Sequence, residues 1–157
     1  MQQRFAVPVL LAGIFMLSIT GAHARVQAGV LECRSGKSVG FIIGSVRRFA
    51  CVFKPAGGGP VHVYRATARR YGLDVGVTNA SLLEWAVLAP TAYVGPGDLA
   101  GRYAGASGSI AVGAGLGANA LVGGSRNGFA LQPLSVEAQR GFNVSLGAEG
   151  FRLSFVR

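Results

Sequence analysis

Apolar and polar residues alternate along most of the chain after residue 24, with the period of two that is typical of β-strands. Groups of glycine, proline and serine interrupt the alternation, as at Pro55–Pro60 and in the loop Ala89–Asp98. The pattern predicts strands at Val26–Arg34, Val39–Val46, Phe49–Lys54, Val61–Arg65, Gly72–Thr78, Leu99–Ala106, Phe129–Leu134, Gly141–Leu146 and Gly150–Val156. About ten short strands in one domain predict an all-β, mainly antiparallel fold, either a small β-sandwich or a barrel, with Gly-rich strands and at most one short helix.

The stretch Ser81–Ala89 is compatible with two different elements. Ser81 is a suitable cap for a helix that begins at Leu82. The apolar run Trp85–Leu88, which ends before Pro90, fits a buried strand equally well. The sequence therefore leaves both a short helix and a strand open here.

The second half of the chain contains a glycine-rich stretch, Ser107–Gly124. With a period of two, its apolar face carries Ile110, Val112, Ala114, Leu116, Ala118, Ala120 and Val122, and its opposite face carries Gly113, Gly115 and Gly117. We expect a strand whose bare face another backbone, a helix or an aromatic ring can approach closely. The run Gly113–Ala118 also matches a dinucleotide-binding motif, but residues 119–125 are too short and glycine-broken for the helix that this motif requires. No cofactor is expected.

The N-terminus has the three parts of an export signal. Arg4 precedes the apolar run Phe5–Ile19, and Ala22-His23-Ala24 forms a small-residue cleavage site. The alternative is an uncut membrane anchor, but about fifteen apolar residues fall short of the roughly 20 that a spanning helix needs. We therefore expect a cleavable signal peptide at residues 1–24, a single domain at residues 25–157, and a periplasmic or secreted bacterial protein.

The predicted export determines how Cys33 and Cys51 are interpreted. In an oxidising compartment, an isolated pair of cysteines favours a structural disulfide. The alternative is a redox-active pair, which usually has a C-x-x-C spacing and a lowered thiol pKa. Because this spacing is absent, the sequence favours the structural bridge.

The chain is strongly basic, with a formal net charge of +9 that loses one unit when Arg4 is removed with the signal. The positive residues are dispersed, with short pairs only at Arg47-Arg48 and Arg69-Arg70. Export argues against nucleic acid as a partner. The charge indicates solvated faces or attraction to an anionic envelope surface.

No residues form a local catalytic or metal-binding motif. His62 is the single histidine after residue 24, and a Gly-x-Ser-x-Gly motif is absent. The carboxylates are scattered at Glu32, Asp74, Glu84, Asp98, Glu137 and Glu149. We expect no catalytic residues, no metal and no enzymatic activity. The enzymatic alternative is a hydrolase of envelope polymers that uses Asp74 with Glu84.

Several short motifs are similar to those of a known family. They include Gly29-Val30-Leu31 before Cys33, Gly40-Phe41 before Ile43-Gly44-Ser45, Cys51 before Phe53, Trp85-Ala86-Val87 before Ala89-Pro90-Thr91, Gly117–Ser125 and Leu131–Glu137. Together they resemble a family of small exported bacterial proteins known only as domain of unknown function 992. The resemblance implies a periplasmic single-domain protein in which Cys33 and Cys51 belong to the pattern. The family has no known activity, so the resemblance assigns no catalytic residues. Ser109–Ser125 and Asn143–Phe151 are also similar to the C-terminal part of the SYLF (Ysc84-like) lipid-binding domain.

These observations favour a non-enzymatic envelope protein that binds a lipid-like partner, such as anionic lipid, or another envelope component. The alternative is a purely structural or interaction protein without a ligand. The sequence determines neither the binding residues nor the oligomeric state.

Overall fold

The computed structural model describes residues 24–36, 38–40, 45–70, 76–78, 82–105, 116–117, 119–135 and 150–157. Their strands are β1 (Val26–Arg34), β2 (Ser38–Gly40), β3 (Ser45–Pro55), β4 (His62–Arg70), β5 (Gly76–Thr78), β6 (Leu82–Ala89), β7 (Gly101–Gly105), β8 (Leu121–Gly123), β9 (Phe129–Pro133) and β10 (Phe151–Phe155). Within the described residues the helical structure is one short 3-10 turn, η1 (Ser125–Asn127). The predicted all-β class is confirmed.

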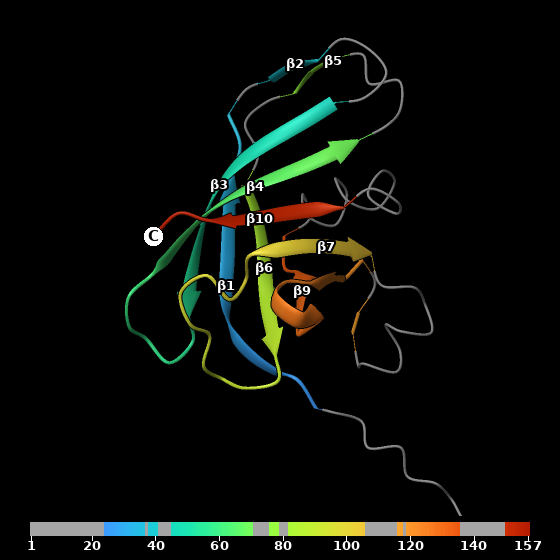
Figure 1. The fold of residues 1–157 in the computed structure, drawn as a ribbon. Coiled ribbons are helices and arrows are strands. Elements are labelled where there is room, and N and C mark those ends of the chain that lie inside the picture. The colour runs from blue at the N-terminus through green and yellow to red at the C-terminus, as the bar shows by residue number, and fades with distance from the viewer. Residues whose placement is uncertain are drawn as a thin grey trace, which may run out of the picture.

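Eight of the strands form a closed antiparallel barrel in the order β1-β3-β4-β10-β7-β8-β9-β6 (Figure 1). The barrel closes where β6 pairs with β1 over nearly the whole length of both strands. The C-terminal strand β10 lies between β4 and β7. The strands β2 and β5 pair with each other beyond one end of β3 and β4. The barrel is therefore the correct one of the two predicted architectures.

The interior of the barrel is filled by side chains from alternate positions of its strands. The largest fully buried residues there are Trp85, Tyr64, Tyr103, Phe53 and Phe151. The ring centroids of Trp85 and Phe151 lie 6.1 Å apart, and those of Tyr103 and Phe151 lie 6.3 Å apart. An eight-stranded barrel is just wide enough for side chains to fill it. In the described part of the chain, the interior of the barrel is therefore a packed core.

In the described part of the predicted glycine-rich strand, only Leu121–Gly123 forms a strand, and the described residues of its apolar face do not face the barrel interior. In β8, Leu121 and Gly123 face the barrel interior. Leu116 and Ala120 instead pack against Ala130 of β9 and form a second, smaller buried cluster with it. The sheet register decides this, because a shift by one residue moves a whole face from one side to the other. Residues 106–115 and 118 lie outside the described residues, as does the predicted strand Gly141–Leu146.

Other predicted boundaries are corrected: β4 continues to Arg70 instead of ending at Arg65, and β7 begins at Gly101 instead of Leu99. The pair Arg47-Arg48 was expected to separate two strands, but β3 runs without a break from Ser45 to Pro55. Polar side chains do not end a strand whose neighbour supplies hydrogen bonds, and β3 pairs with β4 from Ser45 to Phe53. The open alternative at residues 81–89 is also resolved, because Leu82–Ala89 forms strand β6.

Candidate anion-binding surface

Four adjacent strands of the barrel, β3, β4, β10 and β7, carry basic residues and no acidic ones. Their sequences contain Lys54 and seven arginines, namely Arg47, Arg48, Arg65, Arg69, Arg70, Arg102 and Arg152, but no Asp or Glu. Because neighbouring residues of a strand point to opposite sides, only some of these share a face. The exposed arginines on the outer face are Arg48, Arg65, Arg69, Arg102 and Arg152, and we call them the arginine face. Lys54 is also exposed, but it is paired with Glu32.

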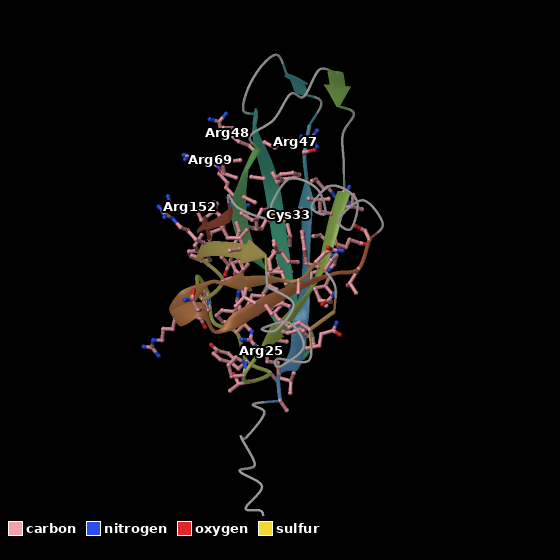
Figure 2. All side chains as sticks on the ribbon, turned by 90° about the vertical axis from the view of Figure 1, so that its right-hand side faces the viewer. Arg25, Cys33, Arg47, Arg48, Arg69 and Arg152 are labelled. Atoms are coloured by element: carbon pink, nitrogen blue, oxygen red, sulfur yellow. A yellow bond between two sulfur atoms is a disulfide. The ribbon has the colours of Figure 1, made fainter. Side chains whose placement is uncertain are left out.

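The strand register aligns the arginine face. Arg48 lies opposite Thr67, Thr67 opposite Arg152, and Arg152 opposite Arg102. These four residues therefore form one row across four strands, because directly opposite residues of antiparallel neighbours share a face. Figure 2 shows Arg48, Arg69 and Arg152 projecting from the same side of the barrel.

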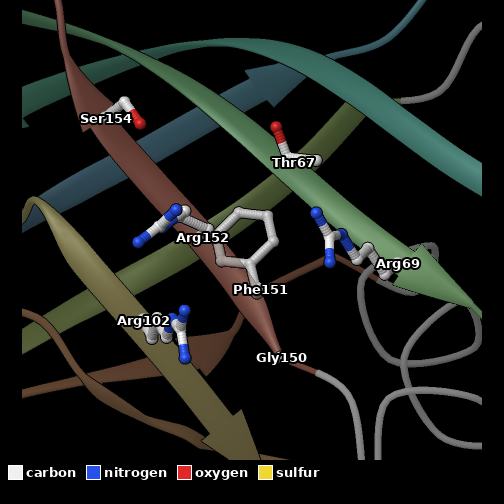
Figure 3. A pocket seen from close by; sticks show the side chains of 7 residues that line it. All are labelled: Thr67, Arg69, Arg102, Gly150, Phe151, Arg152 and Ser154. Atoms are coloured by element: carbon white, nitrogen blue, oxygen red, sulfur yellow. The ribbon is translucent and has the colours of Figure 1, made fainter.

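A hollow of about 410 Å³ opens on the arginine face. Its charged and polar lining consists of Arg69, Arg102 and Arg152 with the hydroxyl residues Thr67 and Ser154 (Figure 3). Gly150 also lines the hollow. The arginines come from β4, β7 and β10, so each of three strands supplies one.

The arginine face has no internal charge compensation within the described part of the chain. None of its five guanidinium groups forms an ion pair with a described residue. The acidic Glu32 on β1 is paired with Lys54, at 2.6 Å from its Nζ. Arginine stays charged at any pH that a protein tolerates, so the face is permanently positive. Like charges directly opposite one another, as at Arg102 and Arg152, destabilise a sheet slightly.

The predicted disulfide is present, between Cys33 and Cys51. The two cysteines lie directly opposite each other on β1 and β3, and both are fully buried in the barrel. A buried disulfide cannot exchange readily with thiols in solution. The structure therefore supports the structural role, and the bridge is consistent with an oxidising location.

The remaining sequence candidates do not form one site. His62 is buried at the start of β4, where its ring packs 5.7 Å from that of Phe53. Asp98 accepts a hydrogen bond from the amide of Gly95 and so stabilises a turn. Asp74, Glu137 and Glu149 lie outside the described residues. The described residues contain no cluster of three or more His, Cys, Asp or Glu that could hold a metal ion.

Glu84 lies opposite Glu32 on the outside of the barrel, and both line a second hollow of about 560 Å³. Paired carboxylates can act in hydrolysis when one is an acid and the other a base or nucleophile. Here the ammonium group of Lys54 engages the carboxylate of Glu32. Glu32, Glu84 and Lys54 therefore form a charge cluster on the outside of the barrel.

Two buried tyrosines hold the turn that lies between β6 and β7. The Tyr103 hydroxyl donates a 2.8 Å hydrogen bond to the Leu99 carbonyl, and the Gly97 amide donates to the Tyr64 hydroxyl at 3.1 Å. Burial raises the pKa of both hydroxyls, and each therefore stays neutral at physiological pH. These groups support the fold and do not reach the arginine face.

The sequence of the chain matches the family described as "Protein of unknown function (DUF992)" over residues 13–154. The chain belongs to the DUF992 family. No curated protein and no solved structure matches it. The likeness of this DUF992 protein to the SYLF domain stays a prediction. The described residues contain no helix with the length and apolar character needed to cross a membrane.

Sequence reasoning did not find the arginine face of this DUF992 protein, because its residues are dispersed along the chain. One signal was available within β4, where Arg65, Thr67 and Arg69 alternate with buried residues and so share the outer face. Arg102 and Arg152 lie far away in sequence and join that face only through the pairing of β10 with β4 and β7.

Proposed function

We propose that the protein is a non-enzymatic module of the bacterial envelope that binds an anionic lipid surface through the arginine face. The observation that supports this proposal is the row Arg48, Thr67, Arg152 and Arg102 on four strands that carry no acidic residue. The packed interior leaves no described space for a lipid chain, so contact would be made with headgroups. Export through the predicted signal peptide would place the protein beside such lipids.

The expected affinity is modest. Each Arg or Lys near an anionic bilayer contributes about 1 kcal/mol, so the arginine face supplies on the order of 5 kcal/mol. That corresponds to a dissociation constant in the sub-millimolar range for accessible lipid. The attraction is screened by salt, with a Debye length of about 10 Å at 0.1 M.

Vesicle co-sedimentation tests this proposal. The full protein should sediment with vesicles of phosphatidylglycerol and phosphatidylcholine at low salt and not with phosphatidylcholine alone. Arg48→Glu should weaken sedimentation several-fold. Arg126→Glu is the matched control, because it makes the same charge change in the η1 turn, outside the four strands. If both variants lose sedimentation equally, the binding depends on net charge and not on the arginine face. Absence of binding at low salt would refute the proposal.

Two alternatives give different results. A purely structural protein would sediment with neither vesicle, and native mass spectrometry of the periplasmic protein would show no bound lipid. A hydrolase would show activity in a substrate screen that Glu84→Gln lowers. We expect equal background rates for the wild type and Glu84→Gln, because Lys54 already engages the partner carboxylate of Glu32.

A further inference from the structure

We propose that the hollow between Arg69, Arg102 and Arg152 is a specific site for a phosphate ester group. This inference rests on the proposed function and deepens it, because it names the chemical group that the arginine face recognises. Diffuse attraction by the whole arginine face and binding in the local hollow predict different effects of substitutions. Arg48 belongs to the face but does not line the hollow.

The lining of the hollow suits a phosphate ester in charge. Three guanidinium groups from three adjacent strands surround one opening. A phosphate monoester carries a charge of about −1.5 to −2 near neutral pH, whereas a carboxylate carries only one negative charge. Arginine is suited to this role because its planar fork donates two parallel hydrogen bonds to phosphate oxygens. Three fixed positive charges therefore match a phosphate better than a carboxylate.

The hydroxyl groups add hydrogen-bond donors to the same opening. Thr67 and Ser154 line the hollow on β4 and β10, and neither hydroxyl has a hydrogen-bond partner among the described residues. Phosphate offers three acceptor oxygens, enough for both arginine and hydroxyl donors. The site thus combines charge with directional donors, which a diffuse basic surface lacks.

The size of the hollow indicates more than an isolated ion. A volume of about 410 Å³ lies within the range of about 300–1,000 Å³ that is usual for small-molecule sites. It has room for the phosphate together with part of the alcohol that it esterifies. That alcohol can belong to a lipid headgroup or to a soluble phosphate ester, and the experiment distinguishes these two sources.

The test measures thermal stability and affinity with two soluble probes, inorganic phosphate and glycerol 1-phosphate. At constant ionic strength, each probe should raise the melting temperature of the wild type relative to chloride, because a ligand that binds only the folded state stabilises it. Isothermal titration should show at least tenfold weaker binding of glycerol 1-phosphate to Arg152→Gln. Arg126→Gln, which removes the same charge in the η1 turn, outside both the hollow and the arginine face, should bind it within about twofold of the wild type.

Two further variants separate recognition from folding and charge. Arg152→Lys keeps the charge but loses the bidentate fork, so its affinity should fall between those of the wild type and Arg152→Gln. Arg152 is exposed, and Arg152→Gln removes a repulsion with Arg102, so the variant should fold at least as stably as the wild type without ligand. A low affinity of Arg152→Gln therefore reports on the site and not on unfolding.

A comparison of two kinds of vesicle, matched for surface charge, shows whether the phosphate belongs to a lipid headgroup or to a soluble ester. One contains phosphatidic acid, which presents a phosphate monoester, and the other contains phosphatidylserine. Preference for phosphatidic acid that is lost in Arg152→Gln indicates a lipid headgroup. Binding of glycerol 1-phosphate without binding to either vesicle supports the site but refutes the lipid surface of the proposed function. Equal effects of Arg48→Gln and Arg152→Gln on vesicles, with no binding of soluble phosphate, would overturn the site and leave the diffuse surface.

Discussion

Gly123 lies on β8 at a point where the neighbouring strand leaves no room for a side chain. A Cβ atom added there would overlap the carbonyl oxygen of Arg102 and approach the Cα atom of Tyr103 at 2.7 Å. Gly123→Ala should therefore lower the free energy of unfolding by about 1–3 kcal/mol, the usual cost of overpacking a core. Urea unfolding measures this change. Gly105→Ala on β7 is the control, since nothing lies within 4 Å of its added Cβ atom, and it should stay within about 0.5 kcal/mol of the wild type.

Tyr103 gives the fold a dependence on alkaline pH. Burial, and secondarily Tyr64, raises the pKa of its hydroxyl above the ordinary value of 10.0. Below pH about 10 the folded and unfolded chains both keep this proton, so the group adds no pH dependence. Above that pH the unfolded chain loses the proton while the folded chain holds it. Stability should then fall by up to about 1.4 kcal/mol per pH unit from this group.

Tyr103→Phe separates this effect from other alkaline damage. At neutral pH it should cost about 1 kcal/mol, because the Leu99 carbonyl loses its hydrogen bond. Between pH 10 and pH 11.5, set by the ordinary tyrosine pKa of about 10, the melting temperature of the variant should fall less steeply than that of the wild type. Parallel curves for the two proteins would mean that Tyr103 ionises normally in the folded state.

At the scale of the element, the disulfide fastens β1 to β3 near one end of their pairing, one residue pair before Arg34 and Ala50. Cys33 and Cys51 are opposite each other and 18 residues apart in sequence. Closing a loop of this size restricts the unfolded chain and stabilises the fold by about 3 kcal/mol. The double variant Cys33→Ala/Cys51→Ala should melt on the order of 10 °C lower. Reductant present during the melt reaches the bridge once the chain unfolds, so it should lower the melting temperature of the wild type and leave the variant unchanged. An equal response of both would contradict this account.

The strands themselves were largely predictable, because alternation is a local property of the sequence. The predicted strand Val26–Arg34 coincides with β1, and Gly150–Val156 extends β10 by one residue at each end. The choice at residues 81–89 was not predictable, because Trp85, Ala86 and Val87 are all buried in β6 and the alternation disappears. Burial of both faces depends on what packs outside the barrel, which the local sequence does not specify.

At the scale of the whole molecule, strand order and register determine the surface. The barrel places the last strand, β10, between β4 and β7, although neither neighbours it in sequence. This placement brings Arg152 into line with Arg102 and next to Arg69 in one hollow. The sequence predicted the positive charge but not its concentration, because the pairing partners of β10 are set by packing across the barrel.

The same placement makes β10 necessary for the closure of the barrel. Its inward residues Phe151 and Leu153 are buried, and its backbone pairs with both β4 and β7. A chain that ends at residue 149 would leave two strand edges unpaired and expose the aromatic core, which favours aggregation. We expect this truncation to abolish the cooperative unfolding transition in urea. The control is Arg152→Gln/Ser154→Ala, which keeps the strand and its inward side chains and should unfold in one transition like the wild type. If the truncated chain unfolded cooperatively at the wild-type urea midpoint, the barrel would be stable without β10. That result would contradict the claim that β10 is necessary for its closure.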